Sequence, residues 1–329
     1  MDKGLSRAEV QQGCGQILGV HDCALSVEEG EILVLMGLSG SGKSTLLRAV
    51  NGLTPVVRGH VEVATDAGMV DVTHASARAL RRIRQSHVAM VFQQFGLLPW
   101  RTVQENVGLG LELAGVPRAE RARRTTEQLA LVGLSDWAAR RVGDLSGGMQ
   151  QRVGLARAFA TQAPILLMDE PFSALDPLIR TRLQDELLDL QKRLRRTIVF
   201  VSHDLDEAFK LGNRIAIMEG GRIVQCGTPQ EIFTNPATDY VAEFVAHMNP
   251  LGVLTAADVM RPLDGDTAPG PVIAATAPLR EVMLALRGQN AALRVTVDGR
   301  DNTPPLGRID SADVLAGLLD PRGAPAPAG

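Results

Sequence analysis

The sequence has 329 residues and a formal net charge of −3, a length that suggests about two domains and a charge that gives no case for a nucleic-acid partner. Cys14, Cys23 and Cys226 form no metal-ligand spacing and leave an odd thiol, which favours a reduced compartment. Since no apolar run approaches the roughly 18 residues that a membrane helix requires, we expect a soluble chain.

Short apolar runs separated by glycine turns fill the chain from Met1 to about Phe92. We expect strands in these runs, at Cys23–Val27, Ile32–Met36, His60–Val63 and Val88–Phe92. Together they predict a β-rich subdomain joined to the segment that follows Met36.

That segment fits the phosphate-loop pattern G-x-x-x-x-G-K-[ST]. It consists of Gly37, Leu38, Ser39, Gly40, Ser41, Gly42, Lys43 and Ser44. The glycines let successive N–H groups point at a phosphate, Lys43 reaches the β and γ oxygens, and Ser44 can ligate Mg²⁺. A helix from Lys43 to about Asn51 would add its positive N-terminus. The alternative, a glycine turn that binds nothing, is disfavoured by the strand in front of it.

The middle of the chain, between about Gly96 and Phe159, has helical periodicity. Two arginine runs are interpreted as solvated helix faces: Arg78, Arg81, Arg82 and Arg84, and Arg118, Arg121, Arg123 and Arg124.

Strands and helices alternate again after Pro164. We expect strands at Ile165–Met168, Thr197–Val201 and Arg214–Met218, with a long helix over Pro177–Leu194. Continuous apolar strands are typical of a parallel sheet that is buried on both faces. A turn at Gly227–Pro229 and a helix over Gln230–Met248 follow.

Four further motifs accompany the phosphate loop. They are Gln93 after Phe92, the run Leu145–Arg152 (LSGGMQQR), the acids Asp169 and Glu170 followed by Ser173–Asp176, and His203 after an apolar strand. In this order the chain resembles the ATP-binding subunit of ATP-binding-cassette (ABC) transporters, over roughly residues 15–248. The resemblance implies an α/β P-loop NTPase fold, with a mixed or parallel sheet core and a helical subdomain at about residues 96–159.

The resemblance also implies the roles of the site residues. The phosphates of ATP would bind to Lys43 and the other loop residues from 37 to 44, and Thr45 would contact the α-phosphate. Mg²⁺ would be held by Ser44, Asp169 and Gln93. Glu170 would be the general base, His203 would contact the γ-phosphate, and Gln93 would sense metal and water.

The signature residues Ser146, Gly147 and Gly148 and the D-loop residue Asp176 complete the site of the opposite subunit in that family. The resemblance therefore implies a homodimer with two ATP molecules between its subunits. The alternative for Gly147 and Gly148 is a simple helix cap.

Adenine recognition departs from the family pattern. The position where family members usually carry an aromatic ring falls near Cys14, and no Phe, Tyr or Trp precedes Phe92. We expect adenine to rest on Ile17, Leu18 or Val20, or on His21.

Three stretches resemble the importers of glycine betaine, choline and related osmolytes: residues 36–48, 91–99 and 172–180. This implies a peripheral subunit on the cytoplasmic face of the inner membrane, with transmembrane permease subunits and a periplasmic or lipid-anchored substrate-binding protein as partners. Another ABC importer, or a soluble ABC ATPase, is the alternative. A P-loop kinase or GTPase would lack LSGGMQ and the switch histidine.

The segment from Gln93 to Glu105 is unusually apolar. Phe95, Leu97, Leu98 and Trp100 are expected to dock on the permease, or else to fill the local core.

The predicted domains are residues 1–248, 249–320 and a disordered tail, 321–329. Within the second we expect strands at Pro271–Ala274, Leu293–Val297 and Leu306–Ile309, and helices at Pro278–Arg287 and Ser311–Leu319. This order is similar to one cystathionine-β-synthase-type regulatory module, half of the usual pair. It would regulate the subunit and stabilise a dimer, or it is a decayed remnant.

Overall fold

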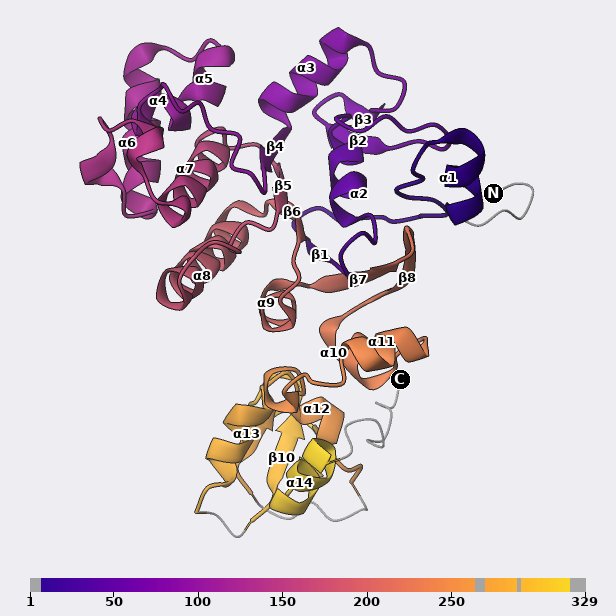
Figure 1. Ribbon diagram of the computed structural model, residues 1–329. Helices are drawn as coiled ribbons and strands as arrows, with labels where there is room; N and C mark the ends of the chain where they lie inside the picture. Colours follow the sequence, from indigo (N-terminus) through magenta and orange to yellow (C-terminus); the bar gives the residue numbers. More distant parts are fainter. Residues whose placement is uncertain (1–6, 264–269, 289–290, 320–329) are drawn as a thin grey trace. The chain divides into compact units, whose positions relative to one another are not determined.

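A computed structural model describes residues 7–263, 270–288 and 291–319 (Figure 1), so the predicted tail 321–329 lies outside the described residues. The chain divides into two compact units. Unit 1 comprises Met1–His203 and Ala216–Ile223, and unit 2 comprises Asp204–Ile215 and Val224–Gly329.

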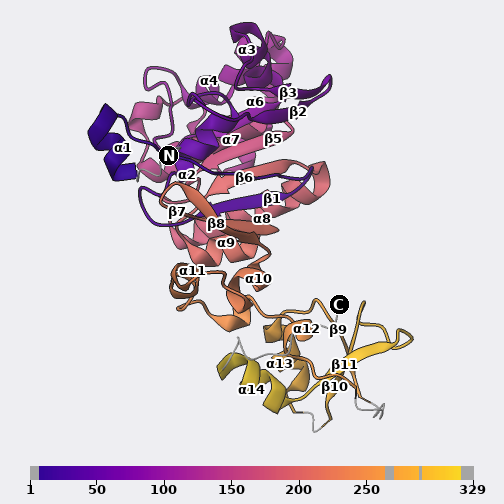
Figure 2. The same cartoon turned by 90° about the vertical axis from the view of Figure 1, so that its right-hand side faces the viewer.

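A six-stranded sheet organises the first part of the molecule (Figure 2). Its strands, in spatial order, are β4 (Val88–Val91), β5 (Ile165–Asp169), β6 (Thr197–Val201), β1 (Ile32–Met36), β7 (Arg214–Glu219) and β8 (Arg222–Gly227). The pairs β4–β5, β5–β6 and β1–β6 are parallel. The predicted parallel α/β fold is therefore confirmed.

The strand β1 is buried along its whole length, as its unbroken apolar sequence predicted. The prediction for Cys23–Val27 is wrong. Its side chains alternate between half-buried and exposed positions, but the segment is not a strand, and the Cys23 thiol instead donates to the carbonyl of Gly221. The strand expected at His60–Val63 begins two residues later, as β2 (Glu62–Thr65), and pairs with β3 (Gly68–Asp71).

Some helices of unit 1 begin after residues whose side chains cap them, namely Ser76, Thr102, Ser146 and Asp176. The helices of this unit are α1 (Arg7–Cys14), α2 (Lys43–Val50), α3 (Ala77–Ser86), α4 (Val103–Val107), α5 (Leu109–Leu113), α6 (Arg118–Leu131), α7 (Gly147–Ala160) and α8 (Pro177–Leu194), with 3₁₀ turns η1 (Ser135–Trp137) and η2 (Val142–Asp144). The Asp176 carboxylate caps α8 at the Ile179 N–H, and Pro177 occupies the first turn, where its missing N–H costs nothing.

The helical region predicted for the middle of the chain is present. Helices α4, α5 and α6 all pack on α7 (Figure 1). The arginine run of α6 lies largely on a solvated face, as expected, where Arg123 and Arg124 pair with Glu120.

Unit 2 carries helices and a small sheet. Its elements are α9 (Leu205–Leu211), α10 (Pro229–Thr234), α11 (Asp239–Phe244), η3 (Pro250–Gly252), α12 (Ala256–Val259), β9 (Val272–Ala274), α13 (Leu279–Leu286), β10 (Leu293–Thr296), β11 (Pro305–Ile309) and α14 (Ser311–Leu319). The single helix predicted over Gln230–Met248 is wrong. Pro236 disfavours a helical conformation at Asn235, so α10 ends there and α11 begins with a new cap, Thr238.

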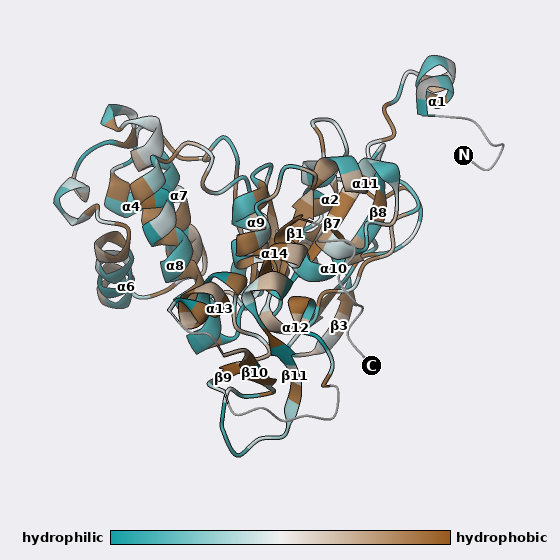
Figure 3. Ribbon diagram, turned by 90° about the horizontal axis from the view of Figure 1, so that it is seen from below, coloured by the Kyte–Doolittle hydropathy of each residue, from teal (hydrophilic) through white to brown (hydrophobic). Residues whose placement is uncertain are grey.

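The small sheet, labelled in Figure 3, has the order β11–β10–β9, and Leu293 and Val295 of its central strand β10 are fully buried. Strand β10 runs parallel to β9 and antiparallel to β11. All three strands and both helices predicted for this segment are present within a residue or two of their expected bounds. In the described parts of the chain, every helix is too short or too polar to cross a bilayer.

Candidate nucleotide site

The phosphate loop joins β1 to α2 and depends on two glycines. Gly37 has a φ of 136° and Gly42 a φ of 100°, both in the region that favours glycine. A Cβ atom on Gly37 would collide with the carbonyl of Met218, and one on Gly42 would collide with the carbonyl of Gly19. The loop can therefore lie close to its neighbours only with glycine at both places.

The Lys43 side chain is folded back into the loop. Its Nζ donates to the carbonyls of Gly37 (2.7 Å) and Leu38 (2.9 Å). Burial lowers the pKa of Lys43, while the charges of Glu170 and Asp169 act in the opposite direction. Because the ammonium is held by carbonyls, and no carboxylate of the described residues pairs with it directly, it remains available to an anion bound in the loop.

Ser44 and Asp169 meet at the carboxyl end of β5. The Ser44 hydroxyl donates to Asp169 Oδ1 at 2.7 Å, and Arg48 Nη2 lies 3.0 Å from Asp169 Oδ2. The carboxylate is fully buried, whereas the Arg48 side chain is 42% exposed. Both carboxylate oxygens thus have donors, and the aspartate has one fixed orientation.

Glu170, the next residue, has an unusual backbone. Its φ is +49°, a left-handed conformation that is uncommon outside glycine and that occurs at functional sites. Its N–H donates to the carbonyl of Val201 at the end of β6. Its carboxylate oxygen Oε2 lies 3.5 Å from Nδ1 of His203. The structure therefore brings Lys43, Ser44, Asp169, Glu170 and His203 to one edge of the sheet.

Ser41 also contacts this cluster, because its hydroxyl accepts from Lys43 Nζ at 3.4 Å, whereas the signature and D-loop residues have other partners. Ser146 caps its own helix α7 at Met149 N, and Asp176 caps α8. Gln93 is exposed, in the turn after β4. Ser39 and Gly40 are exposed at the loop, and Thr45 is half-buried beside Gly19.

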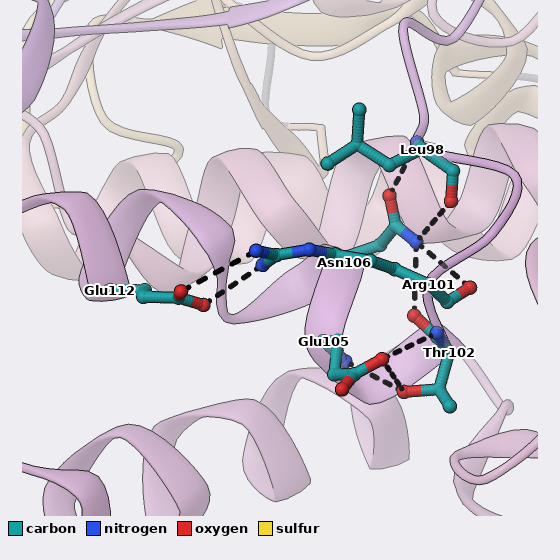
Figure 4. Close-up of polar contacts among 6 residues, drawn as sticks. All are labelled: Leu98, Arg101, Thr102, Glu105, Asn106 and Glu112. Atoms are coloured by element: carbon teal, nitrogen blue, oxygen red, sulfur yellow. Dashed lines mark hydrogen bonds and ion pairs between the residues drawn. The ribbon is translucent and has the colours of Figure 1, made fainter.

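Two side chains hold the segment after Gln93: Arg157 of α7 donates to the carbonyls of Phe95 and Gly96, and Asn106 of α4 bonds the backbone from Leu98 to Thr102 (Figure 4). The Asn106 Oδ1 accepts from the N–H of Leu98, and its Nδ2 donates to the carbonyls of Leu98, Arg101 and Thr102. The Thr102–Glu105 capping box starts α4 directly after the segment. Trp100 is nevertheless 68% exposed, while Phe95, Leu97 and Leu98 are half-buried.

The segment expected to receive adenine lies against the turn between β7 and β8. The His21 N–H donates to the carbonyl of Gly221, whose own N–H donates to the carbonyl of Ser41 in the phosphate loop. Leu18 and Val20 are half-buried, and Ile17 is largely exposed.

Two polar residues of the site were not anticipated from the sequence, Arg48 and Gln151. Gln151 bonds the Glu170 carbonyl from helix α7. One signal was available for Arg48: it lies one helical turn after Ser44, so both side chains share a face of α2.

Comparison with known proteins gives consistent results. The profile of a family described as ABC transporter matches residues 20–173. The chain is 51% identical over 261 residues to the glycine betaine/proline betaine transport system ATP-binding protein ProV of Salmonella typhimurium, which covers 79% of this chain and 64% of that protein. It is 43% identical over 301 residues to the trimethylamine N-oxide transport system ATP-binding protein TmoW of Ruegeria pomeroyi, covering 92% of this chain and 87% of that protein.

The solved structures agree on the fold. The dimeric structure of MJ0796, a bacterial ABC transporter cassette, has a TM-score of 0.60 at 34% identity and covers 64% of this chain and 90% of that one. A dimeric post-hydrolysis state of the same cassette, bound to ADP and Pi, has a TM-score of 0.59 at 35% identity.

Proposed function

The chain belongs to the ATP-binding proteins of ABC transporters, and we propose that it hydrolyses ATP to energise the uptake of a quaternary ammonium osmolyte, such as glycine betaine or choline, by a bacterial importer. The observation that carries the ATPase is the cluster of Ser44, Asp169, Glu170 and His203 beside the phosphate loop. The chain spans 64% of the length of the Salmonella relative, so the transport activity named for that protein is proposed for this chain.

The phosphates of ATP would bind to the loop N–H groups and to Lys43, which would exchange its two carbonyl partners for phosphate oxygens. Ser44 and Asp169 fit Mg²⁺, because a hydroxyl and a carboxylate oxygen, both hard donors, lie 2.7 Å apart. Gln93, exposed in the turn after β4, would supply a further oxygen. The ion, when bound, supplies charge neutralisation at the β and γ oxygens.

Glu170 would accept a proton from a water molecule as the water oxygen attacks the γ-phosphorus. The bond from this phosphorus to the oxygen that bridges it to the β-phosphate breaks, and ADP and inorganic phosphate form. His203, next to the Glu170 carboxylate, would donate to a γ-phosphate oxygen. Thr45 at the start of α2 would contact the α-phosphate.

A homodimer would complete the site. Ser146 caps the N-terminus of α7 with Gly147 and Gly148 in its first turn, so free N–H groups there can bind an anion. In a head-to-tail dimer these residues, with Asp176, would reach the ATP bound to the other subunit. The dimeric state of the solved cassettes supports this arrangement.

The transmembrane permease would dock on the segment Gln93–Glu105, placing the subunit on the cytoplasmic face of the membrane. The exposed Trp100, on a backbone held by Asn106, supports this surface. Trp100→Ala should weaken co-purification with the permease more than it lowers the melting temperature. Trp137→Ala is the matched control, because Trp137 is 39% exposed in η1. If Trp100→Ala instead lowers the melting temperature and leaves co-purification with the permease nearly unchanged, Trp100 belongs to the local core.

The relatives support the proposed substrate class, since they are named for glycine betaine and proline betaine and for trimethylamine N-oxide. Glycine betaine and trimethylamine N-oxide each carry three methyl groups on a cationic nitrogen. Selection would occur in a separate binding protein, through an aromatic cage that favours such cations. Reconstituted with its permease and binding protein, the subunit should drive ATP-dependent uptake of labelled glycine betaine or choline. Uptake of an unmethylated amino acid alone would refute the class, and trimethylamine N-oxide is the second candidate.

A further inference from the structure

The side chain of Gln151 joins helix α7 to the turn that carries Glu170. Its Nε2 donates to the carbonyl of Glu170 at 3.0 Å, and its Oε1 accepts from the N–H of Ala174 at 3.0 Å. The residue is only 2% exposed. A buried amide with both of its polar ends bonded holds its partners in one geometry, because leaving either end unpaired away from water is unfavourable.

The turn held by Gln151 needs such a restraint. Glu170 has a left-handed backbone, which the surrounding structure must maintain. Its carbonyl also accepts from the Ser173 hydroxyl at 3.1 Å and from the Ser173 N–H at 3.4 Å. Both donors of Ser173 come from the same turn, so Gln151 is the donor that ties this carbonyl to a different element.

Helix α7 touches the same turn at a second point. A Cβ atom on Gly148 would lie 3.1 Å from the carbonyl of Ala174, so the glycine of the first turn lets the helix approach closely. Gln151 lies three residues further along, on the same face of α7. The helix that begins with Ser146, Gly147 and Gly148 is therefore bonded through Gln151 to the backbone of Glu170 and Ala174.

We propose that Gln151 is a positioning residue for ATP hydrolysis: it sets the orientation of Glu170 and transmits the position of the signature helix to it within one chain. This inference rests on the proposed function, in which Glu170 is the base and the signature residues bind the nucleotide of the opposite subunit. Movement of α7 on binding that nucleotide then changes the placement of the chain's own base.

Three variants of the full chain test the proposal by steady-state ATP hydrolysis. Gln151→Leu keeps the volume but removes both hydrogen bonds. Its kcat should fall about 10–100-fold with KM for ATP within about threefold, since a displaced catalytic group lowers the rate of chemistry more than binding. Gln128→Leu is the matched control: it makes the same change in α6, where the Gln128 Oε1 is buried without a partner among the described residues, and kcat should not change.

Gln151→Glu gives a dependence of kcat on pH, which a simple loss of packing would not give. A carboxylate still accepts from Ala174 N–H but repels the Glu170 carbonyl, whereas the protonated acid donates to it. Burial raises the pKa of such a carboxyl, so the kcat of Gln151→Glu relative to the unmodified chain should rise as the pH falls from about 8 to about 6.

The outcomes separate this inference from the proposed function. Glu170→Gln is assayed in parallel. If that variant loses its activity but Gln151→Leu stays within twofold of the unmodified chain, the positioning role is refuted and the base remains. If Glu170→Gln is normal, both proposals fall. If Gln151→Leu does not fold, the pH profile of Gln151→Glu decides, and a flat ratio overturns the inference.

Discussion

The nucleotide site and the segment after Asn249 use their side chains in opposite ways. At the site, polar atoms converge: the Asp169 carboxylate takes donors from two residues, and the Glu170 carbonyl takes donors from two more. The later segment instead has an open apolar groove of about 540 Å³ between α13 and α14. It is lined by Leu251, Arg280, Met283, Leu284, Leu286, Arg287, Ser311, Val314, Leu315 and Leu318.

This contrast separates chemistry from association. Hydrolysis needs donors and acceptors fixed in place before the substrate arrives, and the site has them. An exposed apolar groove offers a contact area but does not fix the orientation of a bound group. Such a groove suits the packing of one protein surface on another. Changes in the first region should therefore alter the rate of hydrolysis, and changes in the second should alter assembly or its regulation.

The largest effect should come from Glu170→Gln. The change keeps size and hydrogen bonding but removes the base, so hydrolysis should fall about 10²–10⁴-fold. ATP binding should survive because Lys43 and the loop provide the phosphate contacts, and the variant should elute as an ATP-bound dimer on size exclusion. Near-normal turnover would show that the polar convergence at this residue has no catalytic role.

Base selectivity should be poor. Stacking on an aromatic ring is worth roughly 1–3 kcal/mol per base in nucleic-acid complexes, and the segment of Ile17 to His21 offers no aromatic ring other than the imidazole. GTP should compete with ATP within about an order of magnitude. Displacement of labelled ATP by GTP measures this, with inorganic triphosphate as a control for the phosphate contacts. A thousandfold preference for ATP would mean that another element recognises the base.

Arg48→Met should destabilise the protein without blocking nucleotide binding. A hydrogen bond to a charged group is worth about 1.5–3 kcal/mol, so the melting temperature should fall roughly 3–10 °C in the absence of metal and nucleotide. Because bound Mg²⁺ would offset the buried Asp169 charge, the difference in melting temperature between Arg48→Met and the unmodified chain should shrink when Mg²⁺ and ATP are added. Arg78→Met, at an exposed position of α3, is the control. An equal deficit with and without the ligands would contradict this account of Arg48.

Truncation after Asn249 should have the smallest effect on catalysis. Basal ATPase activity should stay within a few-fold, because the cluster at Asp169 lies in unit 1. Subunit association, or the response of transport to ionic strength, should change if the segment is regulatory. Leu284→Gln in the full chain places a polar group in the groove and should show the same change in milder form. If assembly and regulation match those of the full-length complex, the segment is a remnant.

Sequence patterns predicted the buried strands and the well-capped helices most closely. The bounds of β1 and α8 agree with expectation because an unbroken apolar run and the Asp176–Pro177 cap leave little choice. Strands β3 and β8 were missed: their side chains are mostly half-buried or exposed, so they leave no apolar run to recognise. The motif residues of the site were recognisable one by one. The contacts of Arg48 and Gln151 were not, since their partners lie 121 and 19 residues away in the chain.

The four hydrogen bonds of Asn106 bear on mechanical behaviour. A loop under force normally changes its own dihedral angles. The backbone from Leu98 to Thr102 cannot do so freely, because both ends of this stretch are hydrogen-bonded to the buried Asn106 amide of α4. Force applied at Trp100 must then displace α4 and, with it, the helix α7 on which α4 packs. This stretch of chain therefore passes displacement on to α7, and the residues before it are bonded to the same helix, because Arg157 of α7 donates to the carbonyls of Phe95 and Gly96.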